Sequence, residues 1–306
     1  MLDTSSEQFL KLDRHDLKRD DPDWIAACLA EPTTKVIASW RYRFPVSDGF
    51  VSPMSVAEIS ALTDAAVEYY FLGQESSSGS YFFAAQIAEP SQPLDDWLSI
   101  RHLQNNEPLT EILLFAQGLL NWHRDCSFCE TCASPLQVAS GGAKKLCVNP
   151  DCSKEVFPRI NPAIIVLLLH QDRCLLANSR RFQGDIPMYS CIAGFSETGE
   201  TFEQTLHREV YEEVGLQVTE TRYLCNQPWP FPSSFMVGFH AFTQDTKVTY
   251  HDGEINDARW FSRAELKQAV EAGIIQLSSQ KSISFTLLAD WYNSGTDHRL
   301  EQIQRL

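Results

Sequence analysis

The stretch Gly194–Leu216, GFSETGETFEQTLHREVYEEVGL, contains the most informative pattern of the chain. Gly199 permits a tight turn, and Thr201 with Gln204 has the spacing of a capping box, so the sequence predicts a helix that begins after Thr201. Gly215 is placed to end this helix in a left-handed conformation. Apolar residues recur every four positions and should pack one helix face against a sheet: Phe202, Leu206, Val210 and Val214.

Three glutamates of this helix, Glu209, Glu212 and Glu213, stand at positions i, i+3 and i+4. Successive turns bring their carboxylates together, and like charges at that spacing repel each other. A divalent cation such as Mg²⁺ or Mn²⁺ removes this cost, because it takes oxygen ligands and bridges to substrate phosphates. An exposed acidic helix face is the alternative interpretation, but it leaves the glycines and the arginine of the pattern unexplained.

The flanking segments indicate a sheet around this helix. Residues 163–169 are rich in β-branched side chains and are typical of a buried strand. Residues 188–193 and 234–242 are two further predicted strands. Ser262 and Glu265 have capping-box spacing and predict a second helix, and a final helix is predicted over 282–292. The predicted order in this part of the chain is strand, strand, glycine-rich turn, helix, strand and helix.

The first part of the chain has no catalytic motif. Residues 68–72 and 81–87 are aromatic and β-prone, and the polar segment 73–80 between them predicts a hairpin. Residues 109–122 have apolar side chains at helical spacing. We interpret residues 1–122 as a β-rich α+β domain with a structural or dimerisation role.

Five of the nine cysteines lie close together and predict a metal site. Cys126 and Cys129 form one pair, Cys147 and Cys152 a second, and four thiolates complete a closed tetrahedral zinc site. A closed site leaves no position for a water molecule, so this Zn²⁺, one per chain, should be structural. Two further residues are alternative ligands, because Cys129-x2-Cys132 is also a knuckle and a histidine lies nearby: Cys132 and His123.

Composition limits the function classes. The chain has 306 residues, and 25 Lys and Arg against 40 Asp and Glu give a net charge of −15. That balance argues against a general nucleic-acid binder and against docking on an anionic membrane. The longest apolar run is too short to span a bilayer, and the N-terminus has no apolar core of a signal peptide, so we expect a cytoplasmic protein.

The pattern G-x5-E-x7-R-E-V-x-E-E-x-G-L in Gly194–Leu216 is identified as a Nudix box without a departure. The resemblance implies a Nudix hydrolase, an α/β/α sandwich that cleaves a nucleoside diphosphate linked to another group. It implies that Glu209 and Glu213 bind metal, together with the carbonyl of Ala193, and that Glu212 contributes to metal or water activation. The remaining positions of the box have a structural role by the same resemblance: Gly194, Glu200, Arg208 and Gly215.

The segment 226–234, NQPWPFPSS, follows the box. Its alternating prolines stiffen it in an extended form. It resembles the SQPWPFPxS element of the NADH pyrophosphatase branch of the Nudix family, with Asn226 in place of serine. The resemblance implies these substrate-binding residues: Gln227, Pro228, Trp229, Pro230, Phe231, Pro232, Ser233 and Ser234.

The same branch has a four-cysteine ribbon between an N-terminal domain and the Nudix domain. By this resemblance we divide the chain into an N-terminal domain (1–122), a zinc ribbon (123–157) and a Nudix domain (158–306). Glu254 matches a distant glutamate that binds metal or acts as the base. Three more positions match substrate-binding residues, the last one usually alanine in the branch: Phe157, Phe195 and Ser284. Members are homodimers that split NAD(H) into AMP and NMN(H), and bacterial members also remove NAD caps from RNA 5′ ends.

The sequence therefore predicts a hydrolase with two or more Mg²⁺ or Mn²⁺ ions held by Glu209, Glu213 and Glu254. Glu212 or Glu254 is the expected base. Three alternatives remain open at this stage. The first is a Nudix enzyme for ADP-ribose, a dinucleoside polyphosphate or a sugar nucleotide; the second is a non-catalytic nucleotide-binding or nucleic-acid-binding protein. The third, a zinc scaffold, leaves the box unexplained.

Overall fold

The computed structural model describes residues 12–88, 90, 96–102, 109–181, 184–250 and 253–303. Its contacts divide the chain into two compact units. The N-terminal unit runs to Ile160 and includes Pro230–Ser233, and the C-terminal unit contains Asn161–Trp229 and the chain from Ser234 onward. Residues 123–157, predicted as a module of their own, therefore belong to the same unit as the residues before them.

The N-terminal unit is built on a four-stranded sheet with the order β1-β5-β6-β2. Its strands are β1 (Leu12–Asp13), β5 (Tyr69–Glu75), β6 (Tyr81–Gln86) and β2 (Lys35–Ser39). Strands β5 and β6 pair antiparallel, which confirms the predicted hairpin. A second small sheet and three helices complete the unit: β3 (Arg43–Ser47), β4 (Phe50–Val51), β7 (Trp97–Ser99), α1 (Pro22–Ala30), α2 (Val56–Leu62) and α3 (Thr110–Asp125).

Each face of this four-stranded sheet covers its own apolar core. Side chains alternate along a strand, so Phe82 and Ala84 of β6 pack in one core and Phe83 and Ala85 in the other. The first core contains the apolar face of α3, which confirms the helix predicted over 109–122.

The cysteine-rich segment forms three short antiparallel strands attached to α3. They are β8 (Leu136–Ala139), β9 (Lys144–Cys147) and β10 (Glu155–Val156). The ring of His123 stacks on that of Tyr70 with 3.6 Å between centroids, and its Nε2 lies 2.8 Å from the carbonyl oxygen of Gly142. The buried ammonium of Lys145 donates to the carbonyl oxygens of His123 and Cys126 at the end of α3. These contacts explain why the segment is part of the N-terminal unit.

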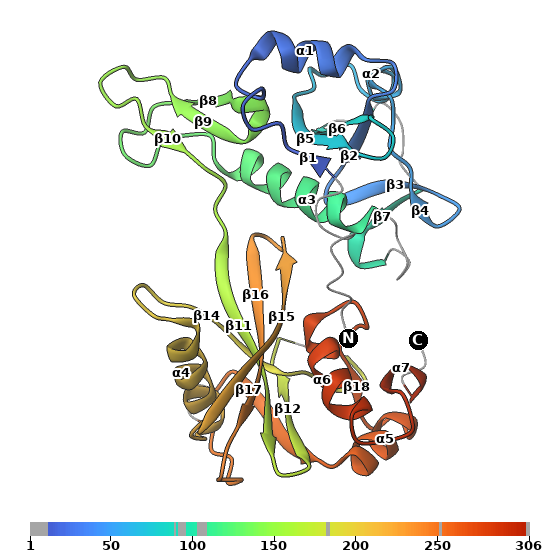
Figure 1. Cartoon of the computed structure of the whole chain (residues 1–306), viewed down its shortest axis with the longest axis vertical. Helices are drawn as coiled ribbons and strands as arrows, with labels where there is room; N and C mark the ends of the chain where they lie inside the picture. The colour runs from blue at the N-terminus through green and yellow to red at the C-terminus, as the bar shows by residue number, and fades with distance from the viewer. Residues whose placement is uncertain are drawn as a thin grey trace. The chain divides into compact units, whose positions relative to one another are not determined.

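The C-terminal unit contains a mixed six-stranded sheet with the order β15-β16-β11-β12-β17, to which β14 adds on β11 (Figure 1). Its strands are β11 (Asn161–His170), β12 (Arg173–Ser179), β14 (Ile192–Phe195), β15 (Glu220–Trp229), β16 (Ser234–Phe242) and β17 (Ile255–Phe261). Strands β11 and β16 are parallel and confirm the strands predicted over 163–169 and 234–242. The strand predicted over 188–193 is divided between β14 and β13 (Met188–Tyr189), and β13 pairs with β18 (Gln276–Leu277) instead.

Helices cover both faces of this sheet, as Figure 1 shows. Ile164, Val166 and Leu168 of β11 pack with the apolar side of α4 (Phe202–Val214). The odd-numbered residues of the same strand pack with α6 (Ile283–Asn293) and α5 (Arg263–Glu271). The unit is therefore the expected α/β/α sandwich.

Both ends of α4 lie where the sequence predicts them. Thr201 and Gln204 form the predicted capping box, and Gly215 ends the helix at φ 70°. Leu206, Val210 and Val214 are buried, but Phe202 is 37% exposed, so its predicted packing is wrong. Phe202, the first residue of the helix, is not part of the core cluster that contains the other three. Helix α6 is not the last, because α7 (Leu300–Ile303) follows. No helix in the described part of the chain is both long and apolar enough to cross a membrane.

Candidate active site

The first glycine of the pattern lies directly against one of its glutamates. A Cβ placed on Gly194 in β14 would be 1.8 Å from Cδ of Glu209 and about as close to both carboxylate oxygens. The carboxylate therefore occupies the space that any other residue at position 194 would need for its side chain. Strand β14 and helix α4 position the two residues, and the loop between them brings them together.

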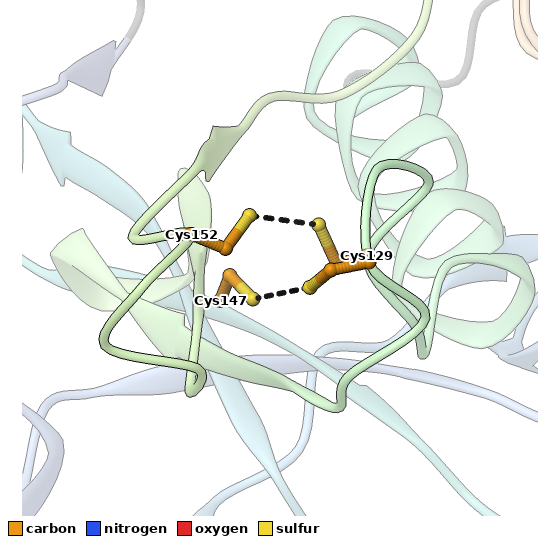
Figure 2. Close-up of side chains that lie close together, drawn as sticks. Cys129, Cys147 and Cys152 are labelled. Carbon is orange, nitrogen blue, oxygen red and sulfur yellow. Dashed lines mark hydrogen bonds between the residues drawn. The ribbon is translucent and has the colours of Figure 1, made fainter.

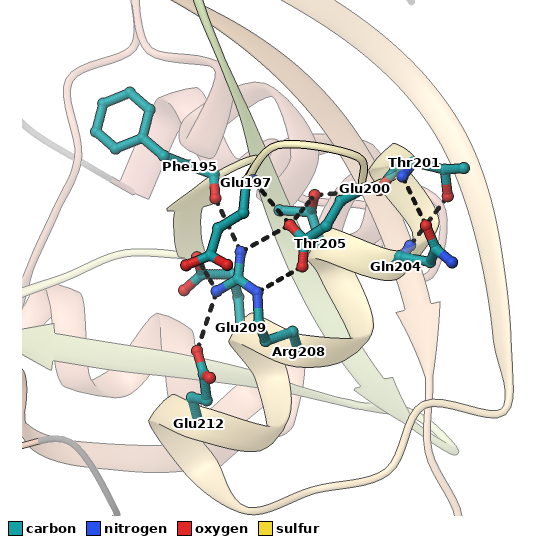
Figure 3. Close-up of polar contacts among 9 residues, drawn as sticks. All are labelled: Phe195, Glu197, Glu200, Thr201, Gln204, Thr205, Arg208, Glu209 and Glu212. Atoms are coloured by element: carbon teal, nitrogen blue, oxygen red, sulfur yellow. Dashed lines mark hydrogen bonds and ion pairs between the residues drawn. The ribbon is translucent and has the colours of Figure 1, made fainter.

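Arg208 joins the acidic side chains of this region (Figure 3). Its guanidinium donates to both oxygens of Glu200, at 2.7 and 2.9 Å. It also donates to Glu209 at 2.8 Å and to Glu212 at 3.0 Å. A fifth hydrogen bond, 2.9 Å long, goes to the carbonyl oxygen of Phe195 in β14. Because a guanidinium has five N–H groups, all its donors are used.

Glu200 ties the loop before α4 to the helix. It accepts hydrogen bonds from the backbone N–H of Glu197 and the hydroxyl of Thr205, each 2.9 Å long. Arg208 and these donors hold the pKa of Glu200 near 2, so the carboxylate stays charged. These contacts support the structural role expected for Glu200 and Arg208.

Glu254, far along the sequence, belongs to the same group of carboxylates. It directly precedes β17. Burial raises the pKa of Glu209, Arg208 opposes that rise, and the negative charges of Glu212 and Glu254 add to it. Glu213 is only 5% exposed, whereas Glu212 is exposed. The charges of Glu212 and Glu254 thus act on Glu209, and Glu213 is a buried residue of the same helix.

This set of side chains fits a hard divalent cation. Its carboxylates outnumber the two arginines that contact them, Arg208 and Arg181. Carboxylate oxygens are the ligands that Mg²⁺ and Mn²⁺ prefer. Ala193, whose carbonyl is a further expected ligand, is exposed beside Gly194 in β14.

The second site is a group of four thiols in the ribbon segment (Figure 2). Sulfur atoms of Cys129, Cys132, Cys147 and Cys152 all lie within 4.8 Å of one another. Cys129 is 3.8 Å from Cys152, and Cys132 is 3.4 Å from Cys147. Such a set can hold one Zn²⁺.

The expectation that Cys126 is a ligand is wrong. Cys126 caps the C-terminus of α3, where its N–H donates to the carbonyl oxygen of Trp122, and its sulfur is not part of the group. Cys132 takes its place. The ring of His123 stacks on Tyr70 and bonds to the carbonyl oxygen of Gly142, so His123 is not part of the group either. The overlapping C-x2-C-x2-C spacing could not decide between Cys126 and Cys132, because the choice depends on where α3 ends.

Each cysteine pair is followed by a residue in the left-handed region, Ala133 at φ 58° and Ser153 at φ 47°. The turns direct backbone N–H groups toward the sulfurs. Such donors lower the pKa of Cys129, and Ser134 lowers that of Cys132 to about 6, whereas burial raises that of Cys147 to about 12. The first pair thus favours the thiolate form that binds metal.

The proline-rich segment is the end of a hairpin rather than a free loop. Residues 226–229 pair with 234–237 across β15 and β16. Proline is tolerated because β15 lies at the edge of the sheet, where a missing N–H breaks no ladder. Asn121 of α3 donates to the carbonyl oxygens of Pro230 and Pro232, each at 2.9 Å. Asn121 belongs to no recognisable sequence motif, so the sequence did not indicate its contact with this segment.

Other residues expected to bind substrate differ in their surroundings. Phe157 and Phe195 are 59% and 52% exposed. The amide of Gln227 bonds to the Lys281 carbonyl and the Ile283 N–H at the start of α6. The Ser284 hydroxyl bonds to the hydroxyl of Ser190 and the N–H of Cys191. The polar groups of Gln227 and Ser284 are thus used in hydrogen bonds within the C-terminal unit, whereas the two phenylalanine rings are accessible to solvent.

Comparison with known proteins agrees with this geometry. A profile described as NUDIX domain matches residues 159–278. The chain is 36% identical over 281 residues to the NAD-capped RNA hydrolase NudC of Mycobacterium tuberculosis (strain ATCC 25177 / H37Ra), across 89% of this chain and 87% of that protein. It is also 36% identical over 200 residues to the NAD-capped RNA hydrolase NUDT12 of Homo sapiens, across 62% of this chain but only 43% of the human protein.

A solved structure, the NUDIX hydrolase from Nitrosomonas europaea, is 22% identical with a TM-score of 0.39, and the match covers 45% of this chain and 79% of that one.

Proposed function

The chain belongs to the Nudix hydrolase family, and we propose that it hydrolyses the pyrophosphate bond of NAD(H) to AMP and NMN(H) and removes NAD caps from RNA 5′ ends. The observation that carries the proposal is the placement of Glu209 against Gly194 and Arg208, within reach of the charges of Glu212 and Glu254. The chain is also similar over most of its length to a hydrolase named for NAD-capped RNA.

The residues that would hold the catalytic cations, two or more Mg²⁺ or Mn²⁺ ions, are Glu209, Glu213, Glu254 and the carbonyl of Ala193. Bound there, the cations would neutralise the pyrophosphate and lower the pKa of a bound water. Glu209 is held by Arg208 and by its contact with Gly194, and these contacts orient its carboxylate.

The chemical step forms a bond between the oxygen of water and one phosphorus and breaks the bond from that phosphorus to the bridging oxygen. Glu212 or Glu254 accepts the proton that water loses. Glu212 is exposed at the surface of α4, and Glu254 precedes β17, so each carboxylate is accessible to water from the acidic site. The other phosphoryl group leaves with the bridging oxygen.

Substrate recognition would use the hairpin end and the accessible aromatic rings. Asn121 bonds to two carbonyl groups of Pro230–Ser233, which limits the motion of this segment before substrate binds. Phe195 and Trp229, which belong to the same unit as the acidic helix, would supply rings for stacking on the nicotinamide or adenine base.

The four thiols Cys129, Cys132, Cys147 and Cys152 would hold one structural Zn²⁺. A homodimer and a cytoplasmic location, both expected from the sequence, remain part of the proposal.

Product analysis tests the reaction. The purified chain is incubated with Mg²⁺ or Mn²⁺ and NADH, NAD, ADP-ribose, a dinucleoside polyphosphate or NAD-capped RNA. We expect NADH or NAD to give AMP with NMNH or NMN, and the capped RNA to give a 5′-monophosphate end. Preferential cleavage of ADP-ribose or of the dinucleoside polyphosphate would refute the proposed substrate.

Glu213→Gln tests the metal-binding role within this reaction. The change keeps the size of a buried side chain but removes its charge, so kcat should fall by at least about a hundredfold while the unfolding midpoint stays near the wild-type value. Glu203→Gln, on the exposed first turn of the same helix, is the matched control and should keep its activity. Wild-type kcat in Glu213→Gln would remove Glu213 from the site.

A further inference from the structure

Two consecutive arginines, Arg180 and Arg181, directly follow β12, in a chain where acidic residues outnumber basic ones by 40 to 25. The guanidinium of Arg181 lies 2.5 Å from the carboxylate of Glu254, and its side chain is 72% exposed. Among the described residues, Glu254 is the only acceptor for this guanidinium. Arg208, the other arginine of the site, uses every donor.

The backbone holds Arg181 in this place. The N–H of Arg180 donates to the carbonyl oxygen of Glu254 at 3.0 Å, and the N–H of Arg181 donates to the hydroxyl of Ser179 at 3.3 Å. The pairing of β12 with β17 is irregular where these residues meet, between Asn178 and Ser179. Glu254 and Arg181 are thus adjacent because the end of β12 pairs with the start of β17, and not only because an exposed ion pair forms.

The position of Glu254 makes this ion pair more than a surface contact. The negative charge of Glu254 adds to the rise in the pKa of Glu209, so the carboxylate that Arg181 holds interacts electrostatically with the acidic helix. A carboxylate oxygen that accepts a guanidinium is less available to a cation, and a positive charge nearby also weakens cation binding. A guanidinium released from a carboxylate binds phosphate oxygens well, because its planar fork matches both groups.

We propose that Arg181 has two partners, Glu254 and a phosphate group of the substrate, and that it changes from the first to the second when a divalent cation takes up Glu254. Arg181 is then a substrate-binding residue that also sets the cation affinity of the site. This inference rests on the proposed function, because the phosphate belongs to the dinucleotide or to the RNA that follows it.

The two roles predict effects of opposite sign for Arg181→Gln. The variant should bind Mn²⁺ about two- to fivefold more tightly, the range expected when an exposed ion pair no longer competes. It should bind inorganic pyrophosphate, in the presence of Mn²⁺, more weakly by about fivefold or more, because a charge-assisted hydrogen bond is lost. If Arg181 only stabilised the fold, its substitution would weaken the binding of both Mn²⁺ and pyrophosphate.

The experiment measures Mn²⁺ binding by the electron paramagnetic resonance signal of the free ion and pyrophosphate binding by titration calorimetry. Arg180→Gln is the charge control: it removes the same charge one position away and keeps the backbone N–H. Arg173→Gln is the ion-pair control, since Arg173 pairs with Glu265 at 2.6 Å at the other end of β12. Both controls should change each affinity by less than the test variant.

An equal increase in Mn²⁺ affinity in Arg180→Gln and Arg181→Gln would overturn the proposal, because the change in net charge alone would then explain the increase. Unchanged pyrophosphate affinity in Arg181→Gln would also overturn it. Neither measurement requires turnover, so they distinguish a failure of this proposal from a failure of the proposed reaction. If the reaction is confirmed, the KM for NADH of Arg181→Gln should rise while Arg173→Gln keeps the wild-type value.

Discussion

Gly194→Ala is the sharpest test of how the acidic site is built. The new methyl carbon would lie 1.8 Å from Cδ of Glu209 and 2.0 and 2.2 Å from its two oxygens, whereas ordinary contact begins at 3.4 Å. The carboxylate would have to move by about 1.6 Å, and that is enough to change the hydrogen bond that Arg208 donates to it.

A misplacement of about 1 Å in a catalytic group costs about a hundredfold in rate. We therefore expect kcat for NADH to fall by at least about 100-fold, equivalent to about 2.7 kcal/mol in the activation free energy. Weaker Mn²⁺ binding should accompany the loss. Stability should change by no more than about 1 kcal/mol, because alanine suits a strand better than glycine and the glutamate can swing away.

Gly199→Ala is the matched control for this variant. Gly199 has φ +92°, and no heavy atom lies within 4 Å of the position that an alanine methyl would take, so alanine there meets backbone strain and no clash. It should lower the free energy of unfolding by about 1–2 kcal/mol and leave kcat unchanged. A Gly194→Ala enzyme with wild-type kcat and Mn²⁺ affinity would show that the observed contact with Glu209 is not the working arrangement.

Three further changes test other parts of the structure. Cys132→Ser should lose the bound zinc and lower the unfolding midpoint, while Cys126→Ser should keep about one zinc per chain; metal analysis and thermal unfolding check both. His123, whose pKa burial lowers to about 4, should stabilise the fold above pH 6.5 and lose about 3 kcal/mol of that contribution as the pH falls to 4. In urea unfolding, His123→Phe should therefore be less sensitive to pH over this window, and an unchanged slope would contradict it. Asn121→Ala leaves two proline carbonyls without their donor and should raise the KM for NADH and cost about 1–3 kcal/mol in stability.

Local signals in the sequence predicted local structure well. The capping box at Thr201 and the left-handed Gly215 were correct because each acts over four or five neighbouring residues. The β-branched run 163–169 was correct for a similar reason, since a strand buried on both faces requires apolar side chains at every position. Phe202 was wrong because periodicity does not say where the sheet beneath a helix ends.

The cysteine ligands show where local spacing becomes insufficient. Cys126-x2-Cys129 and Cys129-x2-Cys132 are equivalent as patterns, and only the end of α3 at Asp125 separates them. The backbone N–H of Cys126 caps the C-terminus of α3. Cys129 and Cys132 follow it, and their sulfurs lie close to those of Cys152 and Cys147. That difference arises from packing between α3 and the strands of the ribbon segment.

For this protein the sequence alone predicted an acidic, metal-binding helix, because its glutamates are three and four residues apart. The tertiary structure decided which residues join them. Glu254 and Arg181 are paired because the end of β12 meets the start of β17, and the carboxylate of Glu209 has its position because β14 presents a glycine. Contacts between residues distant in the chain depend on strand register and on the space between elements. The spacing of residues within one segment predicts neither of these.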